Sequence, residues 1–176
     1  SIKKKHQGVI TIIIPRHIDR VKSIKLECNK LNLKSQILSE GEIIKEKNEI
    51  IIINSYGVVS NYLSICKSVF IGKSMIKKLK FVGGQNPIEA AKFGCKIYHG
   101  PFIYNFEELY NLLSEYKITE QINDENELAK KLSIDLLDSD RINKVAIENI
   151  NKLGNKILLN TFYEIEEIIK NENFKA

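Results

Sequence analysis

The sequence predicts an α/β domain with a doubly wound parallel sheet, and three observations support this fold class. Short β-branched runs alternate with segments of helical periodicity along most of the chain. The first run, 9–14, is β-branched throughout, which is typical of a strand buried on both faces. Several of these runs end in polar or glycine-containing turns that lead into predicted helices. Strands that alternate with helices in this way imply right-handed crossovers.

The expected elements follow in chain order. Apolar β-branched runs predict strands at 9–14, 34–38, 49–53, 68–71, 96–98 and 118–121. Apolar residues at helical spacing predict helices at 19–31, 58–66, 87–93, 106–116 and 125–137, and two C-terminal helices that divide near Gly154. Residues 72–85 are expected to form a loop. In such a fold, ligands bind at the carboxyl ends of the strands.

Composition limits the class of protein without selecting a partner. A chain of 176 residues that is 43% hydrophobic suits one globular domain with a sizeable core. The net charge of +5 permits nucleic acid, an anionic membrane or a phosphorylated substrate, but the lysines are spread along the sequence. Three cysteines without Cys-x-x-Cys spacing indicate neither a disulfide framework nor a zinc site. No apolar run is long enough to cross a bilayer, so any membrane contact is expected to be peripheral.

Polar residues follow the first and third predicted strands. Pro15 ends the first strand, and the guanidinium of Arg16 could bind phosphate oxygens beside the next helix. The turn after the third strand, 54–58, contains Gly57, which would let a ligand approach the backbone closely. A solvated loop and an ordinary strand-to-helix turn would have the same sequences, so both interpretations stay open.

The segment Gly83-Gly84-Gln85-Asn86-Pro87-Ile88-Glu89 joins a two-glycine loop to a predicted helix. Asn86 is the expected N-cap, Pro87 the first helical residue and Glu89 the partner of Asn86 in a capping box. The functional interpretation adds that the Glu89 carboxylate could accept hydrogen bonds from vicinal ribose hydroxyls. The segment lacks the spacing of a phosphate-binding NTPase loop, so ATP hydrolysis is not indicated.

A second capping box is expected from Asn105 to Glu108, after the segment His99-Gly100-Pro101, and a structural role explains it better than a functional one. The three histidines are scattered without metal-binding spacing. No metal site is therefore predicted.

Taken in this order, the segments resemble the C-terminal domain of the 3-deoxy-D-manno-octulosonic acid (Kdo) transferases, which add Kdo to the lipid A precursor. Residues 15–20 resemble the family's Pro-Arg-His-Pro-Glu-Arg, and residues 83–91 resemble its Gly-Gly-His-Asn-Pro-Leu-Glu-Pro-Ala. Residues 100–106 resemble its Gly-Pro-His segment, which ends in Asn-Phe. The resemblance extends over nearly the whole chain. It implies the Rossmann-like, C-terminal half of a two-domain GT-B glycosyltransferase.

The resemblance also implies a ligand and a set of residues. CMP-Kdo would be the donor of an inverting transfer in lipopolysaccharide biosynthesis, without cofactor or metal, at the cytoplasmic face of the Gram-negative inner membrane. Pro15 and Arg16 would line the CMP phosphate, residues 56–58 would border the cytidine, and Glu89 would hold the ribose. The complete expected donor-binding set is Pro15, Arg16, Tyr56, Gly57, Val58, Asn86, Pro87, Ile88 and Glu89.

No catalytic residue is assigned to this chain, because the family's general base belongs to the N-terminal domain. That domain, which would also bind the lipid A precursor, is expected to precede Ser1. Residues 1–176 are thus expected to be a soluble donor-binding domain that is inactive alone.

The sequence departs from the family pattern at two places. The family's Asp-Thr-x-Gly-Glu is replaced by residues 54–58, so that Val58 stands where a carboxylate is usual. The family's Gly-Gly-Ser-Leu is replaced by residues 72–75, with Lys73 in place of glycine. The following loop, 76–82, is longer than in the family, and its three lysines could contact phosphate or acidic headgroups or simply be solvated.

Two alternatives to a Kdo transferase stay open at this point. One is another GT-B glycosyltransferase that uses a UDP-sugar, because a glutamate on the ribose is widespread among such enzymes. The other is a non-catalytic α/β interaction module, in which the glycines and caps serve only the fold. Nucleic-acid binding is not indicated, because the sequence has neither a helix-turn-helix signature nor an aromatic stacking strip.

Overall fold

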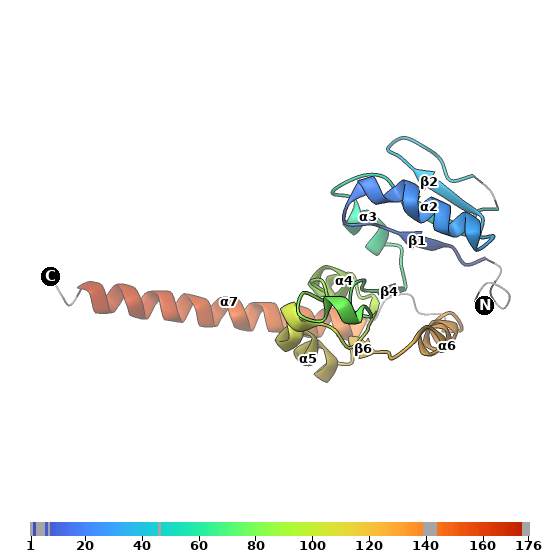
Figure 1. Cartoon of the computed structure of the whole chain (residues 1–176). Coiled ribbons are helices and arrows are strands. Elements are labelled where there is room, and N and C mark those ends of the chain that lie inside the picture. Colours follow the sequence, from blue (N-terminus) through green and yellow to red (C-terminus); the bar gives the residue numbers. More distant parts are fainter. Residues whose placement is uncertain (1, 3–5, 7, 46, 139–143, 174–176) are drawn as a thin grey trace. The chain divides into compact units, whose positions relative to one another are not determined.

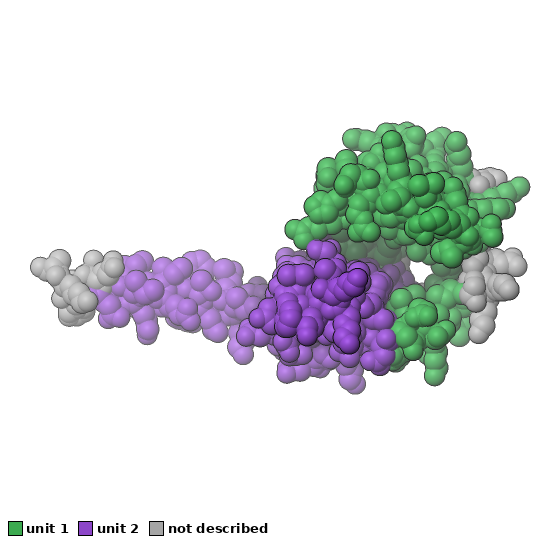
Figure 2. Space-filling view, viewed as in Figure 1, with its two compact units in different colours: residues 1–66, 124–139 green, residues 67–123, 140–176 purple. Residues whose placement is uncertain are grey.

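The computed structural model describes residues 2, 6, 8–45, 47–138 and 144–173. The chain divides into two compact units, one formed by residues 1–66 and 124–139 and the other by residues 67–123 and 140–176 (Figure 2). Each unit contains a three-stranded parallel sheet. Figure 1 labels the main elements.

The sheet of the first unit has the strand order β1-β3-β2. Its central strand consists of four isoleucines that are all buried, because each face of the strand packs in a separate apolar cluster. Ile50 and Ile52 pack with Val21 and Cys28, which belong to α2. The elements of this unit are β1 (Thr11–Ile13), η1 (Ile18–Arg20), α2 (Val21–Lys30), β2 (Ser35–Leu38), β3 (Ile50–Ile53), α3 (Val59–Leu63) and α6 (Glu125–Asp135).

The sheet of the second unit has the strand order β4-β5-β6, and its central strand is again the most buried. Ile97 and Tyr98 of that strand are fully enclosed, as are Tyr110 and Leu113 on one face of α5. The elements of this unit are β4 (Ser68–Phe70), η2 (Lys77–Leu79), α4 (Ile88–Lys92), β5 (Lys96–His99), η3 (Tyr104–Phe106), α5 (Glu107–Glu115), β6 (Thr119–Gln121) and α7 (Lys144–Asn173).

The α/β class with parallel sheets is confirmed, and the predicted strands and helices up to residue 137 are found with small shifts at their ends. The predicted division of the C-terminal region near Gly154 is wrong, because α7 runs without a break from Lys144 to Asn173 (Figure 1). A glycine inside a helix costs only about 1 kcal/mol relative to alanine, and good helix-forming residues on both sides of Gly154 offset that cost. Among the described helices, none is both long and apolar enough to span a membrane.

Candidate functional site

The residues predicted to bind phosphate and cytidine lie at one edge of the first sheet. β1 and β3 are parallel neighbours, with Ile13 opposite Ile52, so the loops that follow them start at the same edge. The Arg16 side chain is exposed and forms neither a hydrogen bond nor an ion pair with any described residue, so its guanidinium is available to an anion. Pro15 is half-buried and rigidifies the start of this loop.

The turn after β3 exposes an aromatic ring next to a glycine, which has no side chain. Tyr56 is 65% exposed, and Gly57 has a φ of 74°, which a residue with a side chain would adopt only with strain. Asn54 anchors the start of the turn, because its N–H donates to the Leu38 carbonyl oxygen at 2.9 Å and its Nδ2 donates to Ser39 Oγ at 3.2 Å. A flat ring beside a glycine suits a planar ligand such as a nucleobase.

Val58 faces the protein. Its side chain packs against the apolar cluster of Leu38, Ile51 and Ile53. The valine that replaces the family's glutamate therefore contributes to the core of the first unit. The side chain is half-buried, so its apolar part packs inward beside the turn.

The glycines of the predicted donor loop in the second unit, Gly83 to Glu89, pack closely against the backbone of Phe102 and Ile103. Gly83 and Gly84 are buried, and a Cβ on Gly83 would overlap the carbonyl oxygen of Phe102. Gly84 has a φ of 79°, and an added Cβ would lie 3.2 Å from the Cα of Ile103. The two glycines are thus required by close backbone packing, in addition to any role toward a ligand.

The helix start that follows this loop differs from a full capping box. The Asn86 side chain does cap the first turn, because its Oδ1 accepts a hydrogen bond of 2.9 Å from the backbone N–H of Ile88. In a full capping box the Glu89 carboxylate would also accept a hydrogen bond from the backbone N–H of Asn86. That bond is absent from the described structure, so this part of the prediction is wrong. Pro87 is fully buried and Ile88 half-buried, whereas Glu89 is exposed and its carboxylate has no partner among the described residues.

The buried Ser74 fixes the segment that packs against the donor loop. Ser74 is 0% exposed; its Oγ donates to the Ile71 carbonyl oxygen at 2.6 Å and accepts from the Gly100 N–H at 2.8 Å. The Phe102 N–H donates to the Ser74 carbonyl oxygen at 2.9 Å. The neighbouring Lys73 has a φ of 65°, which explains why the family pattern has glycine at that position.

Tyr110 contacts the donor loop directly, and His99 packs against Tyr110. The Tyr110 hydroxyl donates to the Gln85 carbonyl oxygen at 2.9 Å, and burial raises the pKa of that hydroxyl well above its ordinary value, so it remains a donor. The His99 ring lies 4.4 Å from the Tyr110 ring, and its Nδ1 is 2.8 Å from the Gly100 carbonyl oxygen. Burial lowers the pKa of His99, so the imidazole is neutral at pH 7.

Other expectations for this region are corrected by the structure. Asn105 lies inside the 3-10 turn η3, and the start of α5 has no side-chain cap, so the predicted capping box from Asn105 to Glu108 does not form. The cap of α6 is not among the predicted features; there, Asp124 Oδ1 accepts hydrogen bonds of 2.8 Å from the backbone N–H groups of Asn126 and Glu127. An aspartate placed just before a helical pattern was the available signal.

The structure therefore forms two groups of predicted site residues. Pro15 and Arg16 lie at the same sheet edge as residues 56–58, and residues 86–89 form a second group at the start of α4. In the part of the chain that the structure describes, no cluster of three His, Cys, Asp or Glu side chains could hold a metal ion.

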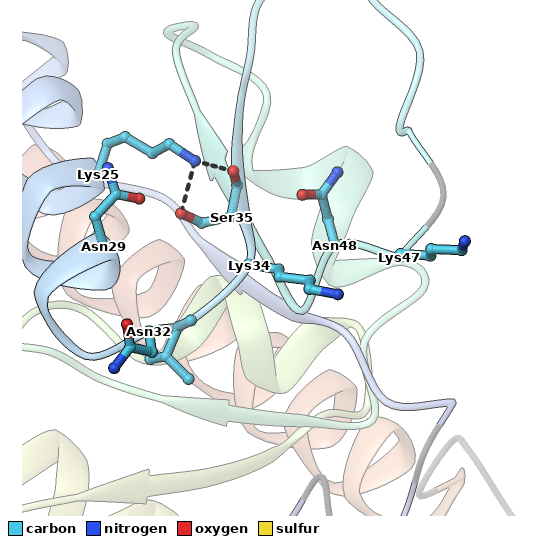
Figure 3. A pocket seen from close by; sticks show the side chains of 8 residues that line it. Lys25, Asn29, Asn32, Lys34, Ser35, Lys47 and Asn48 are labelled. Carbon is cyan, nitrogen blue, oxygen red and sulfur yellow. Dashed lines mark hydrogen bonds between the residues drawn. The ribbon is translucent and has the colours of Figure 1, made fainter.

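A shallow depression also occurs at the opposite edge of the first sheet, near the amino end of β2 (Figure 3). Lys25 extends across it and donates hydrogen bonds to both the carbonyl oxygen and the Oγ of Ser35, the latter at 3.0 Å. The remaining lining residues are Asn29, Asn32, Leu33, Lys34, Lys47 and Asn48. None of the predicted donor-binding residues lines this depression, and Lys25 already uses its ammonium group for a structural bond.

Comparisons with known proteins agree with the motifs. No family model matches the chain. The 3-deoxy-D-manno-octulosonic acid transferase of Haemophilus influenzae is 23% identical over 159 residues, which cover 90% of this chain and 35% of that protein. The transferase of Rickettsia felis is 29% identical over 133 residues, which cover 76% of this chain and 28% of that protein. The chain thus spans about a third of the length of these relatives.

A solved structure extends the agreement to the fold. The crystal structure of the C-terminal CMP-Kdo binding domain of WaaA from Acinetobacter baumannii matches with a TM-score of 0.71 and 20% identity, over 89% of this chain and 77% of that one. At this identity the match establishes the fold, and the sequence relatives establish the ancestry. The chain is a distant homologue of the 3-deoxy-D-manno-octulosonic acid transferases and has the α/β fold of the C-terminal domain of WaaA.

Proposed function

We propose that residues 1–176 bind CMP-Kdo and form the donor-binding domain of a glycosyltransferase that transfers Kdo to the lipid A precursor. The observation that carries this proposal is the state of Glu89. A loop that is fixed by close packing at Gly83 and Gly84 ends in an exposed carboxylate that has no partner among the described residues. The two oxygens of such a carboxylate can accept hydrogen bonds from two vicinal ribose hydroxyls.

The first unit supplies groups that suit the rest of the donor. Arg16 has a free guanidinium for phosphate oxygens, while Tyr56 and Gly57 offer a ring face and close backbone access for cytosine. Val58 takes part mainly through its backbone, because its half-buried side chain packs against the apolar cluster of Leu38, Ile51 and Ile53. Pro15, Asn86, Pro87 and Ile88 contribute by fixing the shape of the two loops.

We assign no general base to this chain. The exposed acidic group at the predicted site, Glu89, is proposed to hold the ribose and is then unavailable to activate an acceptor hydroxyl. Catalysis and binding of the lipid A precursor are accordingly assigned to an N-terminal domain, and the parent enzyme to the cytoplasmic face of the inner membrane. The chain alone is expected to bind the donor without turning it over.

The proposal is tested by calorimetric titration of the chain with CMP, UMP and UDP. We expect CMP to bind at least tenfold more tightly than the uridine nucleotides. Glu89→Gln should weaken CMP binding at least tenfold, because a hydrogen bond to a charged group contributes about 1.5–3 kcal/mol. The matched control is Glu115→Gln, at an exposed position at the end of α5, which should leave CMP affinity unchanged.

The other functions predict different results. Tighter binding of UDP than of CMP would indicate a glycosyltransferase with a UDP-sugar donor. If none of the three nucleotides binds, or if Glu89→Gln and Arg16→Ala leave a measured affinity unchanged, the chain is better described as a non-catalytic interaction module.

A further inference from the structure

The loop 76–82 of the second unit exposes large apolar side chains to solvent. Ile76 is 48% exposed, Phe81 66% and Val82 52%, and the nearby Tyr104 is 61% exposed. Single exposed apolar residues are common on protein surfaces, but a contiguous group of them marks an interaction site. We refer to these four residues as the apolar patch.

The patch has a defined arrangement. The rings of Phe81 and Tyr104 meet edge to face, with centroids 6.0 Å apart. The loop is tightened by the 3-10 turn η2, in which the Leu79 N–H donates to the Ile76 carbonyl oxygen at 2.8 Å. Gly83 follows the loop immediately and packs closely against the backbone of Phe102, so the carboxyl end of the loop is fixed.

The charge of the same region is strongly positive. Lys73, Lys77, Lys78 and Lys80 lie in a stretch, 71–88, that contains no acidic residue. None of the four lysines forms an ion pair with a described residue. Lys80 Nζ lies 4.5 Å above the Phe81 ring, so charge and apolar surface are interleaved. Glu107 and Glu108, which begin α5 three and four residues after Tyr104, are the acidic residues nearest to the patch in the chain.

Exposed aromatic and aliphatic side chains, among lysines that form no ion pair with a described residue, fit a lipid bilayer surface. The apolar side chains would enter the headgroup boundary, while each lysine near an anionic surface adds to binding. A soluble phosphate would use the lysines but would leave the apolar patch in water. We propose that the loop 76–82, with Tyr104, binds the surface of an anionic lipid bilayer.

This proposal is independent of the donor-binding function, because it uses neither Glu89 nor Arg16. It also assigns a membrane contact to this domain itself, in addition to any contact made by the rest of a longer enzyme. Vesicle binding can therefore be measured in the absence of any nucleotide.

Tryptophan fluorescence provides a direct test, because the chain contains no tryptophan. Phe81→Trp places a single fluorophore in the patch, and Tyr116→Trp places one after the end of α5, at a position that is 40% exposed. With vesicles of phosphatidylcholine and 30% phosphatidylglycerol, we expect a blue shift and quenching by brominated lipid for Phe81→Trp only. Vesicles of phosphatidylcholine alone should give at most a small shift.

A second test removes the positive charges of the loop. The triple variant Lys77→Gln, Lys78→Gln, Lys80→Gln should bind anionic vesicles at least tenfold more weakly. The control Lys22→Gln, Lys34→Gln, Lys47→Gln removes the same charge from exposed lysines of the other unit and should stay within twofold of the unchanged chain.

Several results would overturn the proposal. The first is a blue shift for Tyr116→Trp without one for Phe81→Trp. The others are equal losses of vesicle binding in the two triple variants, and equal binding of the unchanged chain to neutral and anionic vesicles. Displacement by inorganic phosphate beyond that of sodium chloride at equal ionic strength would assign the lysines to a soluble phosphate instead.

Discussion

The hydroxyl of Tyr110 donates a hydrogen bond of 2.9 Å to the carbonyl oxygen of Gln85. The bond joins the buried face of α5 to the centre of the loop Gly83 to Glu89, just before the residues proposed to hold the ribose. A donor loop so held keeps its shape without a ligand, and binding then costs less conformational entropy.

Replacing Tyr110 with phenylalanine removes this bond and keeps the ring. The Gln85 carbonyl loses its donor, so we expect the free energy of unfolding in urea to fall by about 1–2 kcal/mol. CMP affinity should fall several-fold because the loop is less fixed. Tyr116→Phe, at a 40% exposed position, is the control and should change neither quantity. Unchanged CMP affinity in Tyr110→Phe would limit Tyr110 to a role in stability.

Two glycines should respond oppositely to the same substitution. In Gly100→Ala the new Cβ would overlap the backbone carbonyl of Ser74, and we expect the variant to lose about 1–3 kcal/mol of stability. In Gly154→Ala the methyl enters open space in the middle of α7, so helix stability should rise by about 1 kcal/mol. Urea unfolding followed by circular dichroism measures both. A stabilising Gly100→Ala would show that the loop can move away from residue 100.

The interior position of Val58 can be tested with neighbouring substitutions. Val58→Glu would bring a carboxylate into an apolar cluster, and we expect stability to fall by about 1–3 kcal/mol. Val59→Glu changes the first residue of α3, which is 37% exposed, and an acidic group in a first helical turn is favourable or neutral. If Val58→Glu unfolds at the same urea concentration as the unchanged chain and binds CMP more tightly, the side chain at position 58 faces the ligand after all.

His99 should make stability depend on pH. Because burial lowers its pKa below the ordinary 6.5, the unfolded chain takes up the proton at a higher pH than the folded chain does. The stabilising contribution is complete above pH 6.5 and declines as the pH falls below that value. We expect urea midpoints to decrease from pH 8 to 5.5, and to decrease less in His99→Gln. His17→Gln, at an exposed position, should retain the full decrease.

Much of the fold could be predicted because its signals are local. The runs 9–14 and 49–53 predict strands, and both strands form. The expected burial of the first run on both faces is wrong, because β1 is at the edge of the order β1-β3-β2 and its residues are half-buried or exposed. The strand buried on both faces is β3, whose four isoleucines lie between two apolar clusters. Asn86 and Pro87 likewise predict the start of α4 within one residue. Gly154 predicts a helix end because glycine is common at such positions. The helix continues because the free-energy cost of one glycine inside a helix is small enough for neighbouring residues to offset.

The support of the donor loop could not be predicted, because it depends on contacts between distant residues. Tyr110 lies 25 residues from Gln85, and Ser74 lies 26 residues from Gly100. A tyrosine on the buried face of a helix predicts packing but not the carbonyl that its hydroxyl reaches. The packing of Val58 also depends on the fold, since its position after a turn is equally compatible with an exposed side chain.

The strand order of the first sheet has a consequence for synthesis. β3 lies between β1 and β2, yet it is the last of the three to leave the ribosome. Neither earlier strand has its hydrogen-bonding neighbour until residues 50–53 emerge, so this sheet cannot begin to form on a nascent chain that ends before β3. α6 belongs to the same unit and follows only after the strands of the second unit have been made. Completion of the first unit therefore has to wait for the second sheet to be synthesised.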